Sequence, residues 1–99
     1  MSRPFSYSDE NFTVIGNMLF IHIIVTEDIK ASSVVAAIPP EIIKRLFTDT
    51  IVCHFEGTNK NLNMHFGTFR FIIADNNLVT LSAIEAHSLL KSIEPLKDI

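Results

Sequence analysis

The side chains able to do chemistry in this chain are few and lie far apart. The four histidines could in principle bind a metal ion or take up a proton, and they are His22, His54, His65 and His87. No two of them stand two or four residues apart, the spacing that places paired ligands on one face of a strand or helix. We therefore interpret them as ordinary core or edge residues, and we expect no metal ion and no cofactor.

The single cysteine, Cys53, lies in the apolar segment Ile51–Phe55. One cysteine excludes an internal disulfide and a multi-cysteine metal site. Its neighbour is His54, but consecutive residues of a strand point to opposite faces, so this imidazole is not placed to activate the thiol. We expect Cys53 to be a small, buried apolar residue.

A catalytic nucleophile or acid–base pair is not indicated either. The serines lie in polar breaks or near the C-terminus, without the Gly-x-Ser-x-Gly context of a nucleophile elbow. The adjacent carboxylates Asp9-Glu10 and Glu27-Asp28 are typical of solvated turns, and three glycines are too few for a phosphate-binding loop. The sequence predicts a protein without enzymatic activity.

Composition narrows the class of partner. The 99 residues carry a net charge of −3, and the eight lysines and arginines are scattered rather than clustered. We therefore expect neither a nucleic-acid partner nor an anionic membrane surface. The longest apolar run, Met18–Val25, is too short to cross a bilayer, so we expect no membrane insertion. With 47% apolar and 19% charged residues, either the core is unusually well filled or part of the surface is buried against another copy.

Two hairpins organise the chain. We expect residues 1–11 to form a flexible lead-in, and residues 12–99 to form one globular domain. In the first hairpin, Phe12–Ile15 returns as Met18–Thr26 around Gly16-Asn17, a pair of residues suited to a primed turn. The return strand is apolar on both faces, which indicates a central strand covered on both sides or covered by a neighbouring subunit.

The second hairpin is the element that the sequence pattern predicts most clearly. Phe69 and Phe71 alternate with polar residues, Asp75-Asn76-Asn77 interrupts, and alternation resumes at Leu78. Gly67 stands where a bulge or a tight bend would divide this strand from the one before it.

Helical signals are weaker. Pro39-Pro40 ends the strand Val34–Ile38, and the spacing of apolar residues after it predicts one short helical turn near residues 40–47. At the C-terminus, Ser82 to Glu85 fits a capping box, and local sequence favours a helix over residues 82–94. A closing strand over Leu89–Leu96 is the alternative reading.

These patterns predict a mainly β fold: an antiparallel β-sandwich or barrel with one short helical turn. The alternative is an α+β fold in which the helix at 82–94 is real. In that case we expect a small intracellular, cytoplasmic adaptor that binds other proteins.

The order of segments resembles one family, the receptor-binding head (knob) domains of bacteriophage tail fibres and baseplate proteins. The resemblance covers roughly residues 12–81. It rests on the opening Ile15-Gly16-Asn17-Met18-Leu19-Phe20-Ile21, the strand end Ala37-Ile38-Pro39, and the late pair Phe69-Arg70-Phe71-Ile72 and Asn76-Asn77-Leu78-Val79-Thr80-Leu81. Where the family usually has Gly-Tyr-Arg-Pro after the proline step, this chain has Pro40-Glu41-Ile42-Ile43-Lys44-Arg45.

The resemblance implies a small antiparallel sandwich or barrel on the virion that recognises a bacterial surface saccharide. It also implies self-association, with a trimer favoured and a dimer as the alternative. No binding residue of the family carries over to a matching position. From the chain itself, we expect the polar loop 57–61 to offer Asn59, Lys60 and Asn61 to a ligand.

Overall fold

The computed structural model describes residues 5–85 and 87–98. Its main feature is an eight-stranded, wholly antiparallel sheet with the order β1-β2-β3-β8-β5-β6-β7-β4. The strands are β1 (Tyr7–Ser8), β2 (Phe12–Ile15), β3 (Met18–Val25), β4 (Val34–Ala37), β5 (Thr50–Thr58), β6 (Met64–Ala74), β7 (Asn77–Thr80) and β8 (Ser88–Pro95). The sheet curls into a half-barrel, so the predicted mainly β, antiparallel fold is confirmed.

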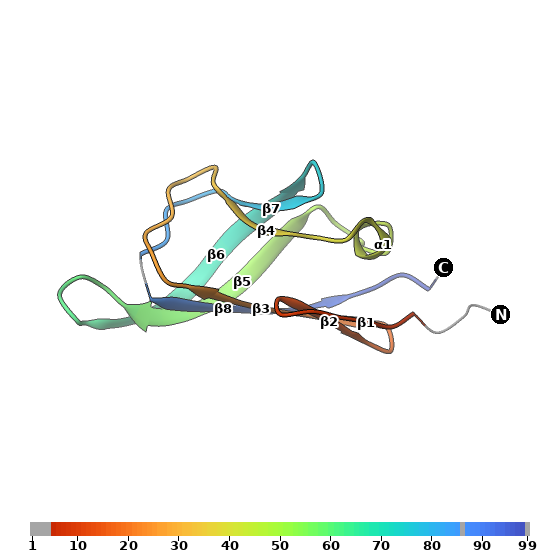
Figure 1. The fold of residues 1–99 in the computed structure, drawn as a ribbon, viewed down its shortest axis with the longest axis horizontal. Coiled ribbons are helices and arrows are strands. Elements are labelled where there is room, and N and C mark those ends of the chain that lie inside the picture. The colour runs from red at the N-terminus through yellow and green to blue at the C-terminus, as the bar shows by residue number, and fades with distance from the viewer. Residues whose placement is uncertain (1–4, 86, 99) are drawn as a thin grey trace.

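The core lies inside this curl. Figure 1 shows β1, β2, β3 and β8 as one layer, from which β5 and β6 rise toward β7 and β4. Along β3, every second side chain points into the core, and these are Leu19, Ile21, Ile23 and Val25. The expected helical turn is α1 (Pro40–Ile43), whose Ile42 is fully buried, so this short helix adds a side chain to the same core.

Both predicted hairpins form. The β2–β3 connection is the two-residue turn at Gly16-Asn17, and Gly16 has a positive φ of 62°. The β6–β7 connection is the pair Asp75-Asn76, with φ of 51° and 64°. Positive φ at both central residues is the geometry of a type I′ turn, which Asp and Asn tolerate better than most residues.

The predicted helix at residues 82–94 is wrong, and the closing strand is correct. Residues 88–95 form β8, which pairs with β3 along its whole length and with β5 along half of it. Two neighbouring strands satisfy its backbone, and this tertiary pairing outweighs the local helical spacing. The Ser82–Glu85 capping box starts no helix, since Ile84 instead bridges Ile29. Ala86, within the predicted helix, lies outside the described residues.

Gly67 is not a bulge. β6 runs through it with unbroken register against β5, from Met64 to Ile72. A Cβ at Gly67 would lie 2.8 Å from the Phe55 ring, so glycine leaves room for this aromatic side chain. Gly57 has even less space for a side chain, because a Cβ there would lie 2.7 Å from the His87 carbonyl oxygen and from the Ser88 backbone.

We expect alanine to destabilise the fold more at Gly57 than at Gly67. Overpacking in a folded interior costs about 1–3 kcal/mol. The Phe55 ring can rotate away from a methyl group, whereas the backbone of β8 can move only by distorting the ladder. Urea unfolding of the two variants should therefore place Gly57→Ala near the upper end of this range. Equal stability of Gly57→Ala and the unmodified protein would contradict the close approach of β5 and β8.

Cys53 is fully buried, as expected from its apolar neighbours. Burial raises the pKa of the Cys53 thiol to about 12, and the Glu94 carboxylate adds to the rise. The physical cause is that a thiolate loses its hydration inside the core. The thiol is therefore neutral in the folded protein at physiological pH, which leaves it inert as a nucleophile.

This raised pKa predicts a loss of stability at alkaline pH. In the unfolded chain a thiol ionises near pH ~8.5. Above that value the unfolded chain sheds a proton that the folded protein keeps until its pKa of about 12. The free energy of unfolding should fall with pH in this window, by at most about 1.4 kcal/mol per unit from this group. Urea titrations of Cys53→Ala should show a shallower fall, and parallel curves for the two proteins would contradict the prediction.

Over residues 5–85 and 87–98, no helix has the length and apolar character needed to cross a membrane.

Candidate functional site

A row of polar side chains crosses the outer face of the sheet, the face that points away from the core. The register places His22 of β3 beside Lys91 of β8, Lys91 beside His54 of β5, and His54 beside Thr68 of β6. All four side chains are exposed. Neighbouring strands lie about 4.8 Å apart, so the four groups form a continuous row.

Apolar side chains flank this row on both sides. On one side Phe20 of β3 pairs with Ile93 of β8, and on β5 the exposed Val52 stands two residues before His54. On the other side Ile24 pairs with Leu89, followed by Glu56 and Phe66. Ile24 is 67% exposed and Phe66 is 85% exposed, so the outer face of the sheet is largely apolar and open to solvent.

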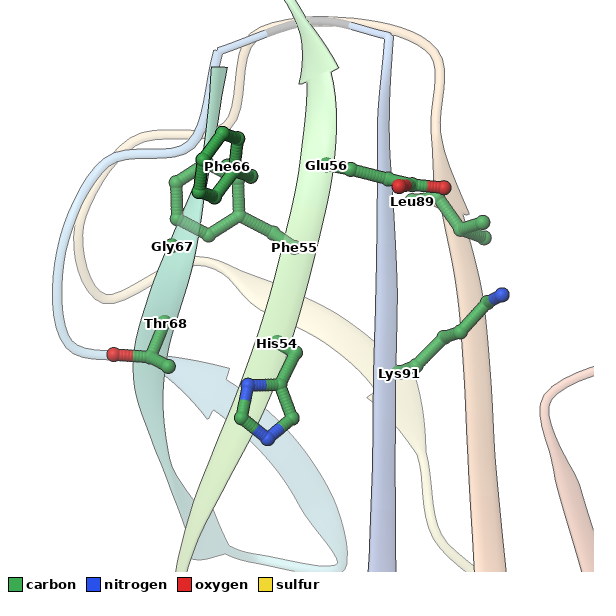
Figure 2. Close-up of a pocket in the computed structure, with 8 residues that line it drawn as sticks. All are labelled: His54, Phe55, Glu56, Phe66, Gly67, Thr68, Leu89 and Lys91. Carbon is green, nitrogen blue, oxygen red and sulfur yellow. The ribbon is translucent and has the colours of Figure 1, made fainter.

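A groove of about 430 Å³ lies on this face, over β8, β5 and β6 (Figure 2). In Figure 2 the Glu56 side chain reaches from β5 across β8, and the Lys91 side chain extends from β8 away from β5. The groove is lined by His54, Phe55, Glu56, Phe66, Gly67, Thr68, Leu89 and Lys91.

The groove combines an aromatic surface with groups that donate and accept hydrogen bonds. Phe66 and Leu89 supply apolar contact area, whereas Glu56 offers acceptors and Lys91 offers donors. Thr68 and His54 can do both. An apolar lining with a few polar groups is the usual composition of a ligand site. This arrangement could hold a ligand that has both apolar and hydrogen-bonding surfaces.

The histidines do not converge. His22 and His54 lie on the outer face on either side of Lys91, and His65 packs against the Phe55 ring with centroids 5.4 Å apart. His87 is exposed, with a φ of 62°, just before β8. Over the residues that the structure describes, no group of three or more His, Cys, Asp or Glu side chains could hold a metal ion.

The predicted binding loop lies at the tip of the β5–β6 hairpin and does not line the groove. The Asn59 Oδ1 accepts hydrogen bonds from the backbone N–H of Asn61 (2.9 Å) and Asn63 (3.0 Å). Lys60 forms an ion pair of 3.2 Å with Asp28, and Asn61 is exposed. Asn59 therefore shapes the loop, while binding of a ligand by Asn59, Lys60 and Asn61 stays a prediction.

Sequence reasoning missed the groove. Local sequence favoured a helix after Ser82 and left a closing strand as the alternative, so Leu89 and Lys91 were not assigned to a face of the sheet. The available signal was the alternation of His54 and Glu56 with Cys53 and Phe55, which puts polar groups on the solvent face of a central strand.

Comparison with known proteins adds no relative: no family model, no curated protein and no solved structure matches this chain.

The hairpin loop offers a matched pair of substitutions. Replacing Asn59 by alanine removes the acceptor of two backbone N–H groups, and we expect a loss of about 1 kcal/mol in unfolding free energy. Asn61→Ala should change stability by less than about 0.5 kcal/mol, as for an exposed side chain without a structural role. Thermal or urea unfolding of both variants measures the difference, and equal values would show that the Asn59 amide does not order the loop.

Proposed function

We propose that this domain is a non-enzymatic adhesion module of a phage particle. It assembles with copies of itself and recognises a bacterial surface saccharide through the outer-face groove. The observation that carries the proposal is the wide outer face of the sheet, on which apolar rows and a polar groove are both open to solvent.

The fold supports the class of protein. The resemblance to tail-fibre heads implies a small antiparallel sandwich or barrel, and the half-barrel agrees with it. The short polar turn and the strand pair that carry the late part of the resemblance are the β6–β7 hairpin at Asp75-Asn76. The virion is accordingly the proposed location.

The exposed apolar side chains support self-association. A domain of 99 residues has little interior, yet Ile24, Met64 and Phe66 are each more than half exposed on one face. Exposed apolar area of this extent on a small domain commonly marks an interaction surface. Burying it against other copies would remove the area from water.

The chemistry of the groove supports a polyhydroxylated ligand. A sugar ring has one less polar face, which an exposed aromatic ring such as Phe66 can cover. Its hydroxyl groups both donate and accept hydrogen bonds, and Glu56, Thr68 and Lys91 provide partners of both kinds. Nothing in the groove requires a particular sugar.

The adaptor hypothesis loses its main support, because it depended on a helix at residues 82–94 and this segment contains strand β8. A protein ligand on the outer face therefore has no separate observation in its favour.

The assembly state tests the first half of the proposal. Light scattering on the purified chain should give a mass above 11.1 kDa, in whole multiples of it. The resemblance favours three copies, with two as the alternative. A single-chain mass at every concentration would contradict self-association.

A pair of histidine variants tests the second half. His54 lines the groove, whereas His22 lies on the same row, on the other side of Lys91, and outside the groove. On an array of bacterial cell-wall polysaccharides, His54→Ala should weaken binding about tenfold, which corresponds to one lost hydrogen bond of about 1.4 kcal/mol. His22→Ala should bind as the unmodified protein does. An equal loss in both variants, or in neither, would exclude the groove as the site.

A further inference from the structure

The first half of β6 has an open edge. β7 pairs with Phe71–Ala74, and the last bond between these strands runs from the Leu81 N–H to the Arg70 carbonyl oxygen (3.2 Å). On that side, no backbone hydrogen bond joins residues 64–69 to any other part of the described chain. Half of an 11-residue strand is therefore unpaired along one side.

The printed hydrogen bonds fix which groups face this edge. The Asn59 N–H bonds to the Asn63 oxygen, and the Ile73 N–H bonds to the Asp49 oxygen, so odd-numbered residues turn their backbone groups toward β5. Successive residues of a strand face opposite neighbours. The N–H and C=O groups of the even-numbered residues, Met64, Phe66 and Thr68, therefore point out of the open edge.

The two outermost strands of the sheet, β1 and β4, are protected against edge-to-edge pairing. β1 has two residues, and β4 carries a register shift between Val34 and Ala36 and is followed by Pro39-Pro40. Short strands, bulges and prolines are the usual protections against edge-to-edge pairing. The open stretch of β6 has no proline and no lysine, arginine or carboxylate between residues 64 and 69.

We propose that this open edge pairs with the same edge of a second copy, antiparallel and about a two-fold axis. The inference rests on the self-association proposed above and specifies the contact that produces it. It also gives an even number of copies, because an edge that pairs with itself closes after two.

The open edge of β6 is complementary to the same edge of a second copy in three ways. An axis near Phe66 sets even-numbered residues opposite even-numbered residues, so the open donors and acceptors of both chains meet in about four to six hydrogen bonds. It also sets the Phe66 side chains of both copies opposite one another on the outer face, with Met64 of each copy opposite Thr68 of the other, and Phe66 and Met64 are 85% and 73% exposed in one chain. The stretch has no lysine, arginine, aspartate or glutamate, so no like-charged side chains of these types meet across the paired edges.

The hairpin has room to reach a neighbour. In Figure 1 the end of the β5–β6 hairpin, drawn in green, extends beyond the rest of the sheet. The molecule measures 53 Å in its long direction against 23 and 19 Å in the others. Pairing near such an extended end leaves the two half-barrels apart.

Thr68 provides a matched pair of variants. Thr68→Pro removes the N–H that faces the edge and leaves the bonds to β5 in place, because residue 68 does not donate toward β5. Thr68→Val keeps this N–H, with nearly the same shape. By sedimentation or light scattering, the unmodified protein and Thr68→Val should have twice the mass of 11.1 kDa, and Thr68→Pro should dissociate at least about tenfold more readily.

Two further variants complete the experiment. Ile93→Lys places a charge on the outer face away from β6, and it should remain a dimer. If Thr68→Pro loses its β-sheet circular dichroism spectrum, Met64→Pro replaces it in the comparison, because this substitution removes another N–H donor of the same edge.

The results separate this inference from the proposed function. A dimer that survives Thr68→Pro, or that is lost in Ile93→Lys alone, overturns edge pairing. A trimer overturns edge pairing and leaves the adhesion module standing. A single chain in solution overturns both forms of self-association, and the polysaccharide array then tests the groove independently.

Discussion

The pairing of β3 with β8 is the contact on which the rest of this structure depends. Eight consecutive residue pairs join Met18–Val25 to Ser88–Pro95, and β8 then joins β5 on its other side. Without β8 the sheet would divide into β1-β2-β3 and β5-β6-β7-β4. The outer-face row exists only because this ladder brings His22, Lys91 and His54 into line.

The sheet has two apolar faces with different roles. The concave face is filled by side chains from nearly every strand together with Ile42 of α1. The convex face keeps apolar rows in water on either side of a polar row. A mainly apolar central strand is usual where both faces are covered, so the composition of β3 is explained only in part by the core. The remaining part is the basis for proposing assembly and binding on the outer face.

Sequence reasoning succeeded where the signal was local. Alternation and turn residues predicted the hairpins at Gly16-Asn17 and Asp75-Asn76, and proline predicted α1. It failed at β8, because residues 88–95 have helical spacing in isolation and become a strand only between two partners far away in the chain. The groove was lost for the same reason, since Leu89 and Lys91 come from that strand. The length of the unpaired edge of β6 depends on where β7 ends, and no local sequence pattern predicts that position.

The position of β8 has a consequence for how the chain reaches this structure. The strand that holds the middle of the sheet follows all the others, so during translation the ribosome releases it after both of its partners. Until then β3 has no neighbour on that side, and its apolar residues are exposed in the nascent polypeptide. Contacts between residues so distant along the chain make folding slow, and the unpaired intermediate is prone to aggregation.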